Sequence, residues 1–312
     1  MMIGLQSIIA QSVYLVILGA LAPKLLRRAQ WVLRAPRLAI ALWQALSAAW
    51  LASLVILGLT LAQRLLERLA WPQEQSPNTA RELIIAAAGL GLAVAVIARA
   101  SHVVARELAW ARRQRRSHLL ALELAGQPAY GLEATIIDHD TPAVYSLPAP
   151  SAPKTVIVST GALHLLGDEE LAAVVAHERG HLRHHDHLVT AIAGALHLAF
   201  PRVPLLRHAR HEIEILAEMA ADDHARRDHS PDALAAALLA LAAARTPRHV
   251  LAAADHSVAD RLRRMLASTK PLPKPTRVGT VATAATALTL PVGLSCTTML
   301  AAVAIVAGRS LS

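Results

Sequence analysis

The sequence predicts a mainly α-helical membrane protein, in which a cytosolic α+β domain lies between the third and fourth of four transmembrane helices. The first observation is composition: 54% of the 312 residues are hydrophobic and the mean hydropathy is +0.41, which is high for a soluble protein. The second is a set of four long apolar stretches, and the third is a mixed strand and helix pattern between the last two. The single cysteine, Cys296, excludes an internal disulfide framework and a multi-cysteine metal site.

The four apolar stretches predict the membrane spans. A bilayer core requires about 20 apolar residues in a helix, and the stretches that approach or exceed this length are residues 3–23, 38–63, 83–104 and 278–308. The third has the least margin, because it continues past Arg99. The first could instead be a cleaved signal peptide, but basic residues follow it and none precedes it, the reverse of a secretory signal. We therefore predict four transmembrane helices.

The basic residues predict the orientation in the plasma membrane. The loop between the first two spans is strongly basic, whereas arginines and glutamates balance in the next loop, residues 64–82. By the positive-inside rule the first loop is cytosolic and both termini are outside. The run "RRQRR" at 112–116 adjoins the third span, which favours contact with lipid headgroups over direct binding of nucleic acid. The predicted divisions are a membrane part (1–105), a cytosolic domain (106–276) and a last span (277–312).

The cytosolic domain begins with strand patterns and continues with helical ones. Three short β-branched or alternating runs, "EATIIDHD", "AVYSLP" and "KTVIVST", predict a small sheet of two or three strands. Acidic residues at 168–170 predict a helix start, because negative charge is favourable in a first turn. Further helices are expected at about 211–227 and 232–244, and residues 188–200 form an apolar stretch too short to span, which indicates a buried or interfacial helix. The run "KPLPKPT" at 270–276 is typical of a stiff linker.

The motif "HERGH" at 177–181 predicts a catalytic metal site. His177 and His181 are four residues apart, so both imidazoles leave one face of the helix and can bind a single ion. Zinc suits two imidazoles and a carboxylate. Glu178 points about a hundred degrees away from His177 around the helix, where it can reach a water at the open position of the metal and act as general base and then as proton donor. A chance match remains possible in a chain with 16 histidines.

The next predicted helix offers a third ligand and a supporting carboxylate. Glu218 and Asp222 are four residues apart, with small alanines between them that permit close helix packing. Glu218 can complete a two-histidine, one-glutamate site, and Asp222 can accept the distal N–H of a metal-binding histidine. Glu214 shares this helix face and could be the ligand instead. Residues that follow the motif have open roles: an accessory metal site or a solvated face for His184, His185 and His187, and a cap or anchor for Asp186.

The motifs "HERGH" and "EMAAD" on consecutive helices match the gluzincin arrangement. With the lead-in "AVYSLPAPSAPKTVIVSTGALHLLGDEELAAVVA" and the arrangement of three spans before and one after, the chain resembles the BlaR/MecR-type membrane metallopeptidases. The resemblance implies a zinc endopeptidase at the cytosolic membrane surface, in which His177, His181 and Glu218 bind Zn²⁺ and Glu178 is the catalytic acid and base. It also implies that the substrate pairs with a strand edge, for which residues 154–160 are the candidate.

The resemblance leaves the biological role open. Antibiotic-sensing members carry an extracytoplasmic penicillin-binding domain after the last span, and this sequence has none there, so we do not expect β-lactam sensing by this chain alone. The first hypothesis is a regulatory protease, whose protein substrate is a transcriptional repressor by resemblance. The second is a quality-control protease of the HtpX type, and the third is a zinc-binding signalling scaffold without proteolysis. A transporter is disfavoured, because the apolar stretches lack ionisable residues of the kind that mark an ion path.

Overall fold

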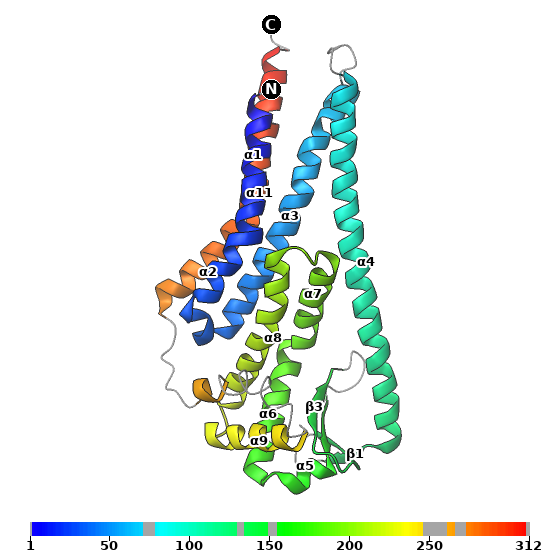
Figure 1. Ribbon diagram of the computed structural model, residues 1–312, viewed down its shortest axis with the longest axis vertical. Coiled ribbons are helices and arrows are strands. Elements are labelled where there is room, and N and C mark those ends of the chain that lie inside the picture. The colour runs from blue at the N-terminus through cyan, green and yellow to red at the C-terminus, as the bar shows by residue number, and fades with distance from the viewer. Residues whose placement is uncertain are drawn as a thin grey trace.

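The helices of the predicted membrane part run side by side (Figure 1). The computed structural model describes residues 2–70, 79–129, 134–148, 155–245, 261–265 and 273–309. The helices of this part are α1 (Met2–Val16), α2 (Ala22–Arg28), α3 (Pro36–Ala70), α4 (Thr79–Ala125) and α11 (Lys274–Arg309). The ends labelled N and C lie together at the end of the molecule opposite the small sheet (Figure 1). The predicted linker at 270–276 lies partly outside the described residues, and its last three residues begin α11.

Among the residues that the structure describes, three helices are long and apolar enough to cross a membrane: Gln6–Arg28, Pro36–Gln63 and Ala80–Leu120. They coincide with the first three predicted spans. The fourth predicted span falls in α11, whose side chains are described only as far as Gly293, and it stays a prediction. α4 has 47 residues, so at 1.5 Å per residue it is about 70 Å long and extends well beyond a bilayer core of about 30 Å.

A π-helical turn, Ile17–Leu21, joins α1 to α2. Pro23 has no amide hydrogen and cannot donate to a carbonyl one turn earlier. The amide of Ala22 donates instead to the carbonyl of Ile17, five residues back, which is the π-helical pattern. The first predicted span is therefore helical throughout its described length but locally widened. A 3₁₀ turn (Gln30–Arg34) then leads into α3.

The sheet has four strands, one more than the upper limit that the sequence predicts. The strands are β1 (Gln127–Ala129), β2 (Ala134–Ile137), β3 (Val144–Leu147) and β4 (Thr155–Ser159). Their order is β1-β2-β4-β3, with β2 and β4 parallel and both outer pairs antiparallel. The extra strand β1 contains "QPA" and lacks the β-branched residues on which the prediction relied.

The helices of the domain follow the sheet in the predicted order. They are α5 (Thr160–Leu165), α6 (Asp168–His184), α7 (Asp186–Ala199), α8 (Pro204–Ala225) and α9 (Pro231–Arg245). The acidic first turn of α6 is confirmed, and Glu170 accepts a hydrogen bond from the amide of Gly167 at 3.0 Å. α8 begins seven residues before its predicted start at 211, because Pro204 at its first position is favourable there.

One hydrophobic cluster joins the membrane helices to α8 of the domain. Trp43 of α3 is completely buried in a cluster that also contains Leu205, Ile213 and Leu216 of α8. α7 packs against α4, with Ala195 and Ala199 buried beside Val103, whereas Leu198 is exposed, so the expected buried or interfacial helix at 188–200 is present and is buried on one side. Figure 1 shows α7 and α8 rising between α3 and α4. α7 and α8 therefore pack against the membrane helices, whereas the sheet, α6 and α9 form separate hydrophobic clusters.

Candidate metal centre

His177 and His181 of α6 and Glu218 of α8 converge on one point. The Nε2 atoms of His177 and His181 lie 3.2 Å apart. Glu218 places Oε2 at 3.6 Å from His177 Nε2 and Oε1 at 3.5 Å from His181 Nε2. Within the described part of the chain, these residues form the one group of three or more His, Cys, Asp or Glu side chains that could hold a metal ion. We call His177, His181 and Glu218 the metal-ligand group.

A glycine allows α6 and α8 to approach closely enough for this convergence. A Cβ atom on Gly180 would lie 3.1 Å from the Cβ of His224 and 3.2 Å from the Cα of Ala221. These distances are shorter than most Cβ contacts, so a side chain at 180 would require its neighbours on α8 to shift. Ala221 is one of the small residues that the sequence indicated for close packing.

The distances fit a zinc ion. Two ligands of a tetrahedral zinc, each at roughly 2.0–2.2 Å from the metal, lie about 3.3–3.5 Å apart. The three measured separations between the ligand atoms, 3.2, 3.5 and 3.6 Å, are close to this value. Two imidazoles and one carboxylate are also a donor set that zinc enzymes use, with a fourth position left open. The residues therefore fit the metal that the sequence predicts.

Each histidine has a carboxylate behind its distal ring nitrogen. His177 Nδ1 lies 3.1 Å from Asp222 Oδ1, and His181 Nδ1 lies 2.9 Å from Asp186 Oδ2. Asp222 is completely buried and Asp186 is 3% exposed. At His181 this contact is a hydrogen bond, which fixes the tautomer and orientation of that imidazole, and Asp222 lies in the matching place behind His177. The sequence anticipated Asp222 in this place, and it left the role of Asp186 undecided.

Two arginines distant in sequence bind these carboxylates. Arg261 donates to Asp222 from Nε at 2.9 Å and from Nη2 at 2.7 Å, and its Nη1 lies 3.0 Å from Glu218 Oε2. Arg37 donates to both oxygens of Asp186. Sequence reasoning missed both contacts. The basic loop drew attention to Arg37, but only as a marker of orientation.

Charged groups around the site shift the pKa values of His177 and of the two carboxylates of α8. Burial acts against a charge on His177, but contacts with Asp222 and Glu218 outweigh burial and raise the pKa of His177 from 6.5 to about 9. Burial also acts against a charge on Asp222, yet Arg261 and His177 lower the pKa of Asp222 from 3.8 to about 2. The pKa of Glu218 is lowered in the same way, because His177 and Arg261 outweigh its burial. The carboxylates are therefore ionised at neutral pH.

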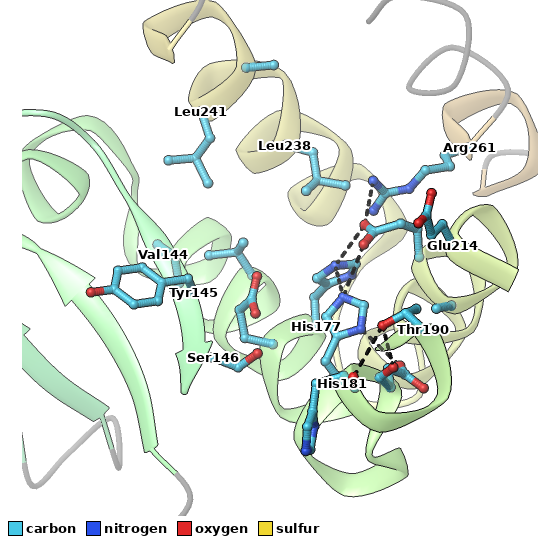
Figure 2. A pocket seen from close by; sticks show the side chains of 17 residues that line it. Val144, Tyr145, Ser146, His177, His181, Thr190, Glu214, Leu238, Leu241 and Arg261 are labelled. Carbon is cyan, nitrogen blue, oxygen red and sulfur yellow. Dashed lines mark hydrogen bonds and ion pairs between the residues drawn. The ribbon is translucent and has the colours of Figure 1, made fainter. Parts of the chain in front are cut away.

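The group lies in a pocket of about 610 Å³. Figure 2 shows His177 and His181 on one side, Val144, Tyr145 and Ser146 of β3 on another, and Leu238 and Leu241 of α9 on a third. Glu178 also lines the pocket. An extended chain that entered here would meet a strand edge, an apolar wall and the half-buried carboxylate of Glu178 together.

The prediction of the strand edge that pairs with the substrate is wrong. Residues 154–160 contain β4, which lies between β2 and β3 inside the sheet, so both of its edges are already paired. The free edge beside the pocket belongs to β3. The error arose because "KTVIVST" has the stronger strand pattern, and strong apolar runs of this kind are typical of buried central strands. The strand at the site is the weaker one, "VYSL".

The alternatives left open by the sequence have clear positions. Glu214 lines the pocket but is exposed, and its Oε1 accepts from Arg210 Nε at 3.3 Å, outside the metal-ligand group. His185 ends α6 in the left-handed conformation, with φ of 55°. The ring of His184 meets that of His224 edge-on, with the ring centroids 6.1 Å apart. His187 lines the pocket. The described residues contain no accessory metal-ligand group built from these histidines.

Comparison with known proteins also indicates a peptidase. The profile of the family described as BlaR1 peptidase M56 matches residues 69–266. One matching curated protein is "Protease HtpX homolog" from Thermoplasma acidophilum, which is 39% identical over 54 residues. The match covers 17% of this chain and 17% of that protein. No solved structure gives a significant match.

Proposed function

This chain belongs to the BlaR1 peptidase M56 family, and on that premise we propose that it is a membrane-bound zinc-dependent endopeptidase, whose substrate is a cytosolic or juxtamembrane protein. The observation that carries the proposal is the convergence of His177, His181 and Glu218 from two helices at zinc-like separations. Family membership implies a peptidase, and the three candidate spans imply the bilayer as its environment.

The residues of the site divide the chemistry between them. His177, His181 and Glu218 hold the zinc ion, which when bound supplies a Lewis acid for the peptide carbonyl and lowers the pKa of water. Glu178 accepts the proton of the attacking water as the C–O bond forms. It then transfers this proton to the nitrogen of the leaving amine as the C–N bond breaks, so it ends the cycle ionised, as it began. Asp222 and Asp186 keep the imidazoles oriented throughout.

β3 is proposed to hold the substrate. Ser159 donates from its backbone amide to the carbonyl of Ala143 at 2.9 Å, and hydrogen-bonded positions alternate along an antiparallel strand. The backbone groups of Tyr145 and Leu147 therefore point toward β4, whereas those of Val144 and Ser146 point toward the free edge. An extended peptide can pair with these two residues and add a strand to the sheet. The apolar wall of Leu238 and Leu241 favours an apolar substrate side chain near the cleaved bond.

Two biological roles fit this chemistry. In the regulatory role the substrate is a specific protein, with a transcriptional repressor as the candidate that the family suggests. In the quality-control role the substrates are damaged membrane proteins, and the local similarity to an HtpX homologue favours this second candidate. The two differ in the breadth of their substrates. A scaffold that binds zinc without proteolysis is the alternative from another class.

The decisive experiment compares newly formed protein N-termini in cells that express the wild type or the Glu178→Ala variant. Both proteins must first be purified and shown to bind equal zinc, because Glu178 is not among the proposed ligands. Glu214→Ala serves as the matched control, since it removes another pocket carboxylate outside the ligand group. A few N-termini that need Glu178 indicate a regulatory protease, and many scattered ones indicate quality control. Identical N-termini in all three strains, with zinc bound, would support the scaffold and contradict proteolysis.

A further inference from the structure

A membrane-spanning helix contributes directly to the support of the metal centre. Arg37 is the second residue of α3 and lies at the start of the candidate span Pro36–Gln63. Its guanidinium donates to both carboxylate oxygens of Asp186, from Nη2 to Oδ2 at 3.0 Å and from Nη1 to Oδ1. A two-point contact of this kind fixes the plane of the carboxylate as well as its position.

The same carboxylate orients a proposed metal ligand. Asp186 Oδ2, which accepts from Arg37, also lies 2.9 Å from His181 Nδ1. His185 makes this contact possible: its left-handed conformation ends α6 and turns the chain, so that Asp186 at the start of α7 faces back toward His181. Three side chains from three helices therefore form one continuous chain of contacts, from Arg37 through Asp186 to His181.

The two metal-binding histidines are supported from different parts of the molecule. The carboxylate behind His177 is held by Arg261, which belongs to the domain itself. The carboxylate behind His181 is held by Arg37 of the membrane part. Asp186 is 3% exposed, so most of its surroundings are protein groups, and Arg37 and His181 are its charged or polar side-chain partners. His181 thus depends on α3 in a way that His177 does not.

A second contact keeps the start of α3 in place. Arg264 donates from Nε to the carbonyl of Leu33 at 2.7 Å, just before α3 begins. The same guanidinium donates from Nη1 to the carbonyl of Met219 at 3.2 Å and from Nη2 to Asp223 at 2.6 Å, both on α8. The cytosolic end of α3 is therefore tied to the helix that carries Glu218, independently of Asp186.

We propose that Arg37 is a positioning residue of the metal centre, which orients the imidazole of His181 through Asp186 and makes the membrane-spanning helix α3 part of the site. This inference rests on the proposed zinc site. Without Arg37, the buried carboxylate of Asp186 loses its fixed orientation and its charge partner, and His181 loses its fixed tautomer. Loss of such an outer partner typically weakens metal binding by about 10- to 100-fold.

The test measures zinc affinity of the full chain in detergent or nanodiscs by competition with a chromophoric chelator. It also records the visible absorption bands of the Co²⁺-substituted protein, which report the geometry of the ligands. We expect Arg37→Met to weaken zinc binding by 10- to 100-fold and to change the Co²⁺ bands. Arg37→Lys, which keeps the charge but not the two-point contact, should bind with intermediate affinity. The matched control is Arg34→Met, because Arg34 is an exposed arginine of the same loop.

A double-mutant cycle separates positioning from general destabilisation. If Arg37 acts through Asp186, Arg37→Met should cause no further loss of affinity in the Asp186→Asn background. Equal zinc affinity and identical Co²⁺ bands in Arg37→Met and the wild type would overturn the inference. It would also be overturned if the double variant lost zinc affinity by the product of the losses in Arg37→Met and Asp186→Asn. Absence of zinc binding by the wild type is a different result: it overturns the proposed function itself, and this inference with it.

Discussion

Arg261 and Asp222 form a two-point ion pair directly behind the metal-ligand group, with Nε–Oδ2 and Nη2–Oδ1 distances of 2.9 and 2.7 Å. Asp222 is completely buried, and the side chain of Arg261 is 11% exposed. The third nitrogen of the guanidinium, Nη1, lies 3.0 Å from Glu218 Oε2. A single cation thus holds the two carboxylates of α8 that serve the site.

Arg261→Met should destabilise the protein strongly. Removing one partner of a buried ion pair costs up to about 3–5 kcal/mol, and Asp222 would keep only His177 as a counter-charge. We expect the midpoint of thermal unfolding of the metal-free protein to fall by several degrees or more at pH 7. Arg263→Met is the control, since it removes an arginine that lies two residues further along the same helical segment. A fall no larger for Arg261→Met than for Arg263→Met would contradict the assignment.

Zinc affinity should rise with pH up to about pH 9. The pKa of His177 in the metal-free protein is about 9, and a metal binds only the neutral imidazole, so binding displaces a proton below that pH. The apparent affinity should therefore increase by about tenfold per pH unit and then level off. Calorimetry in buffers with different ionisation enthalpies measures the proton release. In Asp222→Asn, the affinity should level off at a lower pH, because Asp222 helps to raise the pKa of His177.

The stability of the metal-free protein should change in the opposite direction over this range. The folded pKa of His177 is raised above its ordinary value of 6.5, so the charged imidazole stabilises the fold fully below pH 6.5. This contribution is lost as the pH rises from 6.5 to about 9. Thermal unfolding of chelator-treated protein at pH 6, 7.5 and 9 checks the sign. A rise in stability between pH 6.5 and 9 that disappears in His177→Gln would show that the sign is wrong.

Local spacing explains why much of the site could be predicted. His177 and His181, like Glu218 and Asp222, are four residues apart on a helix, and helix geometry alone puts each pair on one face. The contacts of Arg37 and Arg261 could not be predicted in this way. Arg37 lies 149 residues from Asp186 in the sequence, and Arg261 lies 39 residues from Asp222. Only the packing of α3 and of residues 261–265 onto the domain creates these contacts.

The sheet shows the same limit. Alternating and β-branched residues predicted β2, β3 and β4 correctly as strands, because the side-chain period is a local property. Their order could not be read from the sequence, since strand pairing depends on distant segments. β4 therefore took the edge position in the prediction, although the parallel pairing of β2 with β4 places it in the interior. The chain gives no local signal that the shorter β3 is the strand at the pocket.

Gly89→Ala should disrupt the crossing of α3 and α4. A Cβ atom at Gly89 would lie 2.5 Å from the Cβ of Leu61 and 2.6 Å from the carbonyl oxygen of Gly58, so the helices would have to separate. Overpacking of this kind costs about 1–3 kcal/mol. Gly91→Ala is the matched control two residues along α4, where an added Cβ meets nothing within 4 Å. The midpoint temperature of thermal unfolding in the same detergent should fall for Gly89→Ala only. Equal midpoints for Gly89→Ala and Gly91→Ala would contradict the close crossing of α3 and α4.

Ser146→Pro should weaken substrate binding without disturbing the sheet. The backbone amide of Ser146 points toward the free edge of β3, because the register of β3 with β4 pairs Tyr145 with Ile157 at the neighbouring hydrogen-bonded position. Proline removes this amide hydrogen and is tolerated on edge strands. One lost hydrogen bond of about 0.5–1.5 kcal/mol predicts a fall in kcat/KM of roughly 2- to 10-fold, measured on a peptide that spans an identified cleavage site. Ser146→Ala, which keeps the amide, should cleave this peptide like the wild type. Equal kcat/KM for the two variants, with unchanged unfolding midpoints, would remove β3 from the substrate-binding role.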